Sequence, residues 1–332
     1  MRRFLIFGCG TRYRRPRRDA AAIRLLLLIV DITSSSIGWQ FGTTGFCFTS
    51  QFHFTPLSSN PSRSPPHLIY NRGCGEKEVK KTLWLIITAS AAVLITILWF
   101  RETPGDYFEK GFAVGASVCH QIPSHSFLND GIQFPICARC TGLYLSSFFG
   151  LIYFFAQGKK KGLPGRGYLV LLALLAVVWA GDGVNSFISD FLNQPFLYRT
   201  TNLTRLATGI GMGLVMSTAI VTLFNVTVWK DGSREAVLRN PWQIAIFLTA
   251  SAGSAVLLLF SKLFVFQFLA GISILAVLGI ITLLYSIFWV ILSRRENQMM
   301  KFVDLIPFLL AGFATAIGQV MLLNLLRTAI LG

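Results

Sequence analysis

The chain has 332 residues, of which 53% are hydrophobic and only 13% are charged, whereas about a quarter of the residues of an average soluble domain are charged. Its mean hydropathy is +0.60, and long apolar runs of this kind favour membrane spans over the shorter periodic stretches of a soluble core. The net charge of +16 would fit a nucleic-acid-binding protein, but Lys and Arg also collect in the cytoplasmic loops of membrane proteins. We therefore expect the lipid bilayer as the partner, and no nucleic acid.

The first 75 residues differ in composition from the rest of the chain. They contain an Arg cluster in residues 12–18, a short apolar run at Leu25–Val30, and a stretch rich in Ser and Pro at Pro56–Pro66. The apolar run is too short to cross a bilayer, and the remainder has the composition of a segment without a packed core. We expect residues 1–75 to form a disordered or non-native N-terminal tail.

Seven apolar runs follow the tail, each close to the ~20 residues that cross a hydrocarbon core of ~30 Å as a helix. Because only helices satisfy their own backbone groups in lipid without closing a barrel, the sequence predicts an all-α, polytopic helical membrane protein with about seven transmembrane helices. Residues 76–229 are expected to form a four-helix membrane core with an outer Cys/His loop, and residues 230–332 to add three further helices. The runs are Thr82–Phe100, Ala138–Ala156, Tyr168–Ser186, Thr204–Val228, Trp242–Phe260, Leu263–Leu292 and Asp304–Leu326.

Basic residues alternate between rich and poor loops along the chain. The loops that precede the first run and follow the second, fourth and sixth runs are rich in Lys and Arg, and the loops between them are poorer. Because Lys and Arg mark the cytoplasmic side, this pattern predicts an N-terminus inside, a C-terminus outside, and a multi-pass protein of the plasma membrane. The basic residues of the rich loops are Lys77, Lys80, Lys81, Lys159, Lys160, Lys161, Arg166, Lys230, Arg234, Arg239, Arg294, Arg295 and Lys301.

The strongest candidate for chemistry is the outer loop between the first two runs. It contains a Cys-His pair, Cys119 and His120, and a C-x-x-C pair, Cys137 and Cys140. Three cysteines and one histidine are the ligand inventory of a tetrahedral Zn²⁺ site, so zinc or another transition metal is the expected cofactor. His125 lies in the same segment and is a second histidine available to such a site.

Two other interpretations of these cysteines remain open. The outer location permits a disulfide that ties the loop. Alternatively, Cys137 and Cys140 form a redox pair, because a helix N-terminus and the neighbouring Arg139 both favour the thiolate form.

A second group of polar residues lies at the outer end of the third and fourth runs. Asp182 and Asn185 share one face of the third helix, and Asn202 and Arg205 open the fourth helix across the hairpin. A carboxylate inside a membrane is costly and usually faces a partner or a cavity. These residues therefore form either a structural ion pair between Asp182 and Arg205, or a site for a substrate or an ion. Small residues in the second and fourth runs indicate helix packing; they are Gly142, Ser146, Gly150, Gly209 and Gly213.

Four polar blocks of the chain, in this order, resemble a known family. They are C-H-Q-x-P-x-x-S-F at Cys119–Phe127, P-x-C-A-R-C-T-G-x-Y at Pro135–Tyr144, D-G at Asp182–Gly183 and T-N-x-x-R-x-x-T-G at Thr201–Gly209. This pattern is similar to that of the predicted membrane proteins grouped as "domain of unknown function 2085". The resemblance covers roughly residues 105–225 and implies that the polar blocks belong together. It assigns family positions to Cys119, His120, Gln121, Cys137, Arg139, Cys140, Asp182, Asn202 and Arg205; before Ser126 it implies Arg, where this chain has His125.

The sequence predicts a role in transport or sensing of a small solute or metal at an outer-face polar site. The alternatives are a membrane thiol-disulfide oxidoreductase that passes electrons to a quinone, and a structural protein with a disulfide-tied loop. P-loop, H-E-x-x-H and G-x-S-x-G motifs do not occur in the chain, so an enzyme is not favoured. Neither the substrate nor an oligomeric state can be read from the residues.

Overall fold

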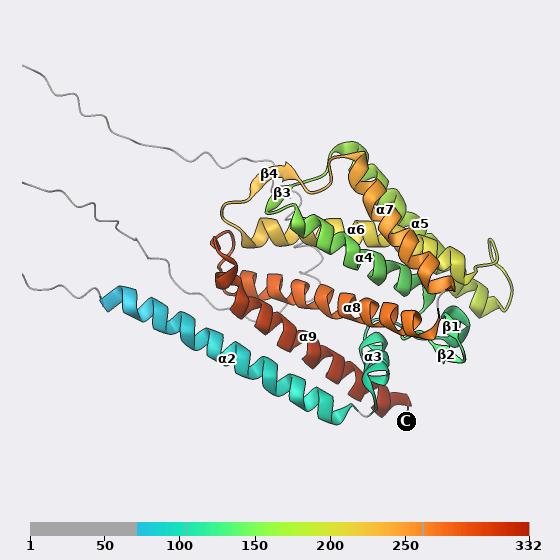
Figure 1. Ribbon diagram of the computed structural model, residues 1–332, viewed down its shortest axis with the longest axis horizontal. Helices are drawn as coiled ribbons and strands as arrows, with labels where there is room; N and C mark the ends of the chain where they lie inside the picture. The colour runs from blue at the N-terminus through green and yellow to red at the C-terminus, as the bar shows by residue number, and fades with distance from the viewer. Residues whose placement is uncertain (1–71, 104, 261, 332) are drawn as a thin grey trace, which may run out of the picture. The chain divides into compact units, whose positions relative to one another are not determined.

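A computed structural model describes residues 72–103, 105–260 and 262–331. The predicted tail lies outside the described residues, apart from residues 72–75, which begin the first described helix. The described part is built of eight α-helices, with four short strands and one 3-10 helix in the connections (Figure 1). This confirms the predicted all-α, polytopic fold. The elements are α2 (Arg72–Glu102), α3 (Tyr107–Ala116), η1 (Pro123–His125), β1 (Leu128–Asn129), β2 (Ile132–Gln133), α4 (Ala138–Ala156), β3 (Lys160–Gly162), α5 (Arg166–Leu192), α6 (Asn202–Val228), β4 (Ser233–Ala236), α7 (Pro241–Phe260), α8 (Leu263–Leu292) and α9 (Phe302–Leu331).

Each of the seven apolar runs is a long helix in the structure, and α4 and α8 have the predicted bounds. Six of these helices, α2 and α5 to α9, are long and apolar enough to cross a membrane. The chain is therefore a multi-pass membrane protein whose helices associate with the lipid bilayer. Helix α4 is not among these six helices, because its mean hydropathy is lower. Its 19 residues include Arg139, two serines and two tyrosines, which lower its hydropathy.

The segment between α2 and α4 contains regular structure that the sequence reading treated as loop. Helix α3 begins after Asp106, whose carboxylate accepts hydrogen bonds from the backbone N–H groups of Phe108 and Glu109. An Asp followed three residues later by Glu is a helix-start signal. Further along, β1 and β2 form a small antiparallel hairpin.

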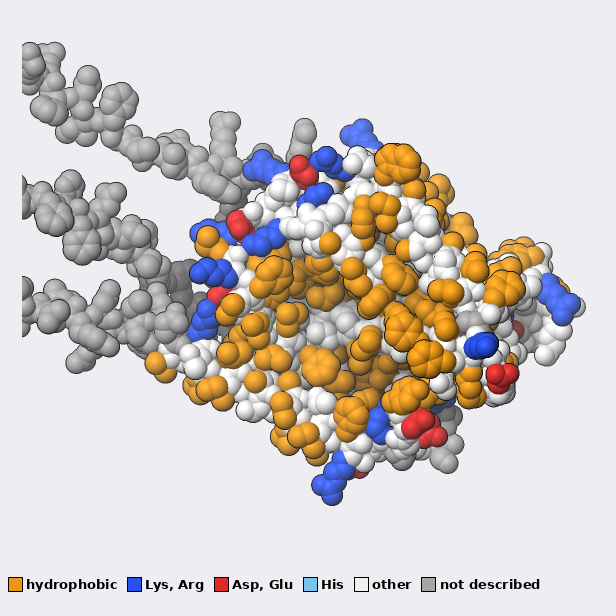
Figure 2. All heavy atoms as spheres, viewed as in Figure 1, with side chains coloured by type: hydrophobic (Ala, Val, Ile, Leu, Met, Phe, Trp, Pro, Cys, Tyr) orange, Lys and Arg blue, Asp and Glu red, His pale blue; other side chains and the backbone are white. Residues whose placement is uncertain are grey.

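The basic loops meet at one end of the helices, which we call the basic end: residues 157–165, 229–240 and 293–301. Lys159 Nζ donates to Asp231 Oδ1 at 3.0 Å and to the carbonyl oxygen of Met300 at 2.7 Å, and β3 pairs with β4 in parallel. The face drawn in Figure 2 is covered by hydrophobic side chains over the helices, with Lys and Arg gathered toward this end. The predicted clustering of positive charge is thus present in three dimensions.

The opposite end, which we call the cysteine end, carries residues 105–137, the α5–α6 loop and the C-terminal part of α9. Asn324 Nδ2 of α9 donates to the carbonyl oxygen of Ala113 at 3.0 Å, and Asn202 Nδ2 of α6 donates to that of Ser126 at 3.1 Å. A hydrophobic cluster that includes Phe134 and Phe266 lies beneath the loop. These contacts hold the Cys/His loop against several helices.

Helices α4 and α6 pack closely because glycines line their contact. A Cβ atom at Gly142 would collide with the carbonyl oxygen of Leu206, and one at Gly209 would collide with that of Arg139. Ser146 lies beside Gly213 in the same contact. This is the close backbone approach expected of small residues in membrane helices, and it brings the first turn of α4, with its cysteines and Arg139, against the start of α6.

Candidate functional site

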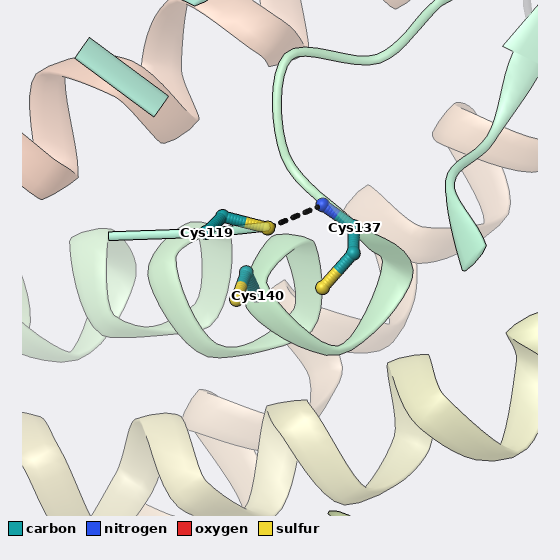
Figure 3. A group of neighbouring side chains, drawn as sticks. All are labelled: Cys119, Cys137 and Cys140. Carbon is teal, nitrogen blue, oxygen red and sulfur yellow. Dashed lines mark hydrogen bonds between the residues drawn. The ribbon is translucent and has the colours of Figure 1, made fainter. Parts of the chain in front are cut away.

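Three cysteines converge at the start of α4. The Sγ atoms of Cys119, Cys137 and Cys140 all lie within 4.8 Å of one another. Figure 3 shows the three side chains: Cys119 comes from the segment that passes across α4, Cys137 from the turn into the helix, and Cys140 from its first turn. Cys119 and Cys137 are buried and Cys140 is half-buried, and all three are free thiols. The structure thus brings together the three cysteines that the sequence singled out.

The loop that carries Cys119 is held by Gln121. This residue has a φ of +57°, in the left-handed region that is unfavourable for a side chain larger than Gly. Its Nε2 donates to the carbonyl oxygens of Phe112 at 2.8 Å and Pro135 at 2.7 Å. The amide of Gln121 therefore ties α3 to the segment before Cys137, and we assign this predicted site residue a positioning role.

The three sulfurs are close enough to influence one another's pKa. The backbone N–H of Cys137 donates to Sγ of Cys119 at 3.1 Å, the contact drawn in Figure 3. Hydrogen bonds from Cys119 and Cys140 lower the pKa of the Cys137 thiol, whereas the hydrogen bond to Cys137 raises the pKa of the Cys119 thiol. Three clustered sulfurs, one of which accepts a backbone N–H, are the kind of environment that surrounds thiolate metal ligands.

His120 is not part of the three-sulfur group. Its side chain is exposed, and its Nε2 lies 3.4 Å from Nδ1 of His125. His125 in turn lies with its Nε2 3.3 Å from Oδ2 of Asp190 in α5. The sequence predicts a four-ligand set of three cysteines and His120. The structure brings the three sulfurs together, whereas His120 lies apart from them.

Arg139 pairs with Asp182, and this differs from the predicted pair of Asp182 and Arg205. Arg139 Nη2 lies 2.5 Å from Oδ2 of Asp182, and Arg139 Nε donates to the same oxygen at 2.9 Å. Tyr198 donates its hydroxyl to Oδ1 of Asp182 at 2.6 Å. The close α4–α6 packing brings Arg139 to the carboxylate, so the partner of Asp182 comes from α4 and not from the adjacent helix of the hairpin.

Arg205 has neutral partners instead. Its Nη2 donates to Ser186 Oγ at 2.8 Å, and its Nη1 donates to Asn202 Oδ1 at 3.0 Å. Asn202 thereby links Arg205 to the Cys/His loop, because its own Nδ2 donates to Ser126. Asn185 holds the α5–α6 loop by donating to Tyr198 O and accepting from Leu197 N.

Three residues of this region were not among the candidates. Tyr198 and Thr208 both approach Asp182, with Thr208 Oγ1 3.4 Å from Oδ2. Burial, followed by the hydrogen bond to Asp182, raises the pKa of Tyr198 to about 12. Asp190 contacts His125. Thr208 belongs to the T-N-x-x-R-x-x-T-G block and was detectable there, whereas Tyr198 and Asp190 have no motif in the sequence.

Comparison with known proteins identifies a family and two relatives. A family described as predicted membrane protein, DUF2085, matches residues 119–219. An uncharacterized protein of Methanothermobacter thermautotrophicus is 34% identical over 106 residues, which cover 31% of this chain and 86% of that protein. The chain belongs to the DUF2085 family. A second relative, an uncharacterized protein of Methanocaldococcus jannaschii, is 29% identical over 121 residues, which cover 36% of this chain and 71% of that protein.

No solved structure matches the chain. The DUF2085 match begins at Cys119 and ends within α6. It therefore contains the three cysteines, Arg139, Asp182 and Arg205, whereas α7, α8 and α9 follow it in the chain.

Proposed function

We propose that this chain holds a soft transition-metal ion on Cys119, Cys137 and Cys140 at the outer face of the plasma membrane, in sensing or transport of a metal or small solute. The observation that carries the proposal is the convergence of three sulfurs within 4.8 Å in a largely buried site. Thiolates are soft ligands and select zinc, Cu(I) and iron–sulfur clusters over harder ions. The donor set therefore fits a metal of this class.

The number of donors narrows the choice of metal. Among the described residues, no fourth His, Cys, Asp or Glu joins the three sulfurs within the same distance. Three thiolates suit Cu(I) in a trigonal site, or Zn²⁺ with its fourth position open to a water or a solute. The N-terminus of α4 supplies partial positive charge that offsets the thiolates, whereas the charge of Arg139 is compensated by Asp182.

The side of the membrane follows from the charges. Lys and Arg gather at the basic end, which the positive-inside rule assigns to the cytoplasm, so the cysteine end faces outward. Helix α4 connects these two ends, because Cys137 precedes it at one and Lys159 follows it near Asp231 and Met300 at the other. For this reason we count α4 as a seventh span, with the C-terminus outside.

Binding at the outer face is favoured over a path through the whole bundle. The charged buried pair and its neighbours lie in α4, α5 and α6. In α8 and α9 the polar side chains bond to each other between helices, as in Tyr285 to Gln319 at 2.9 Å and Trp289 to Thr315 at 3.0 Å. Such bonds hold helices together, so we favour sensing at the surface over translocation.

A thiol-disulfide oxidoreductase is the second candidate. The position of Cys137 at the N-terminus of α4, with its lowered pKa, favours this activity. However, only 2% of Cys137 is exposed, whereas reactive redox cysteines are partly exposed to their substrates. Burial of the thiol therefore favours the metal.

Metal content of the purified chain separates the two candidates. We would replace Cys9, Cys47 and Cys74 by Ser, so that only the three clustered cysteines remain, and load the protein in detergent with Zn²⁺ or Cu(I). Elemental analysis should give one metal per chain in this background, and Cys140→Ser should lose most of it. The background itself is the matched control, since it removes three cysteines outside the group. Absence of metal together with a reversible Cys137–Cys140 disulfide would reject the metal and support the oxidoreductase.

A further inference from the structure

A cavity opens at the cysteine end, in a part of it that the three cysteines do not line. It has a volume of about 500 Å³ and lies between the η1 segment, the end of α5, the α5–α6 loop and the first turn of α6. This volume is within the range of pockets that hold small ligands, roughly 300–1,000 Å³. Its wall includes Arg205, Arg199, Thr200, Asp190 and His125. Sulfur atoms do not line it, so it is chemically different from the three-cysteine group.

The feature that requires explanation is Arg205. This residue is only 6% exposed, yet among the described residues no carboxylate lies within ion-pair distance of its guanidinium. Its two hydrogen-bond partners, Ser186 and Asn202, are neutral. Its Nε is buried and has no partner. A buried cation without a counter-charge is costly, and Arg139 of the same region shows the usual solution, an ion pair with Asp182.

Other groups of the cavity suit the same charge. Arg199 is exposed and adds a second guanidinium at the wall. The cavity also touches the first turn of α6, where the helix dipole is positive. Thr200 accepts a hydrogen bond from Asn185, and its own hydroxyl can donate.

One carboxylate, Asp190, also lines the wall. His125 lies 3.3 Å from it and offers it a partner across the cavity wall. Because two guanidinium groups and one carboxylate line this cavity, its net charge is positive.

We propose that this cavity binds a small solute through an oxyanion group, a carboxylate or a phosphate, held by the guanidinium of Arg205 with Arg199 at the wall. The planar guanidinium matches either oxyanion with two parallel hydrogen bonds. Arg205 lines the open cavity, and such a ligand would supply the ion-pair partner that its guanidinium lacks. Oxyanion binding at this site does not require a metal on the cysteines, so the two proposals can be tested separately.

The test measures binding of two oxyanions to the full chain in detergent. The thermal unfolding midpoint would be followed against sodium phosphate and, separately, sodium succinate, each compared with sodium chloride of equal ionic strength and with EDTA present to exclude metal. A ligand that binds only the folded state raises the midpoint with its concentration, which yields an apparent Kd. We expect at least one oxyanion to raise it, and the arm that does so identifies the group as phosphate or carboxylate.

Variants decide whether Arg205 is responsible. Arg205→Gln should raise the apparent Kd at least tenfold, and Arg199→Gln, an exposed change that leaves the fold alone, should raise it by a smaller factor. Arg101→Gln, an exposed arginine at the end of α2, is the matched control and should bind like the wild type. If Arg205→Gln does not fold, the apparent Kd of Arg199→Gln, compared with that of the wild type, decides the result. No shift with either oxyanion, or equal shifts in the wild type and Arg199→Gln and Arg205→Gln, would overturn the proposal.

Discussion

Arg139 in the first turn of α4 and Asp182 in α5 form an ion pair in which Nη2 lies 2.5 Å from Oδ2. The side chain of Asp182 is almost entirely buried, with 1% exposed, and that of Arg139 is 14% exposed. Since Arg139 is next to Cys140 in the chain, this pair fixes the helix turn that carries Cys140. It connects the three-sulfur group to the polar end of α5.

Removal of either partner should therefore destabilise the protein more than removal of both. Breaking a buried pair leaves an uncompensated charge and costs about 3–5 kcal/mol; Asp182 keeps its bond from Tyr198, so we expect the lower end of this range for Arg139→Gln. Unfolding of Arg139→Gln, Asp182→Asn and the double variant would be measured in detergent. The same cycle with Asp182→Asn and Arg205→Gln is the control, and it should show the smaller coupling. Additive losses in the first cycle would show that the pair does not interact.

Close packing of α4 on α6 gives a prediction about glycines. Gly209→Ala places a Cβ against the carbonyl oxygen of Arg139 and should lower the unfolding midpoint by several degrees, since the helices must separate. Gly181→Ala in α5 is the matched control, because its Cβ would meet nothing within 4 Å. There we expect no loss, as Ala favours a helix over Gly by about 0.5–1 kcal/mol. Equal effects of the two substitutions would argue against the close α4–α6 contact.

His120 should be dispensable for metal binding. Its ring contacts His125 and does not join the sulfurs. In the background without Cys9, Cys47 and Cys74, His120→Ala should keep one metal per chain, with an affinity within a few-fold of its parent. If His120→Ala instead lost as much metal as Cys140→Ser, His120 would be a fourth ligand, as its place beside Cys119 in the sequence suggests.

Orientation can be measured with reporters. A fusion after Lys161 should be active as a cytoplasmic reporter, and one after Arg199 should be active as an external reporter, because basic loops stay inside. The opposite pattern would place the cysteines on the reducing, cytoplasmic side and remove the outer-face assignment.

The helices were predictable from the sequence because each is a long apolar run, and in lipid such runs have few alternatives to helix. The three cysteines were predictable because their residue types and spacing are rare. The partner of Asp182 could not be predicted in this way. Arg205 lies across the adjacent hairpin and was the obvious candidate, whereas Arg139 reaches the carboxylate only because α4 packs closely on α6. Helix α3 was missed because its 10 residues are too short to form an apolar run, although Asp106 and Glu109 marked its start.

The central proposal is tested most directly by the number of sulfur atoms bound to the metal. X-ray absorption spectroscopy on the Zn²⁺-loaded chain, with Cys9, Cys47 and Cys74 replaced by Ser, reports this number and the bond length. We expect three sulfur neighbours at about 2.3 Å, and two in Cys140→Ser if any metal is retained. A zinc ion surrounded only by nitrogen and oxygen, or a sulfur count that Cys140→Ser leaves unchanged, would contradict the three-cysteine site.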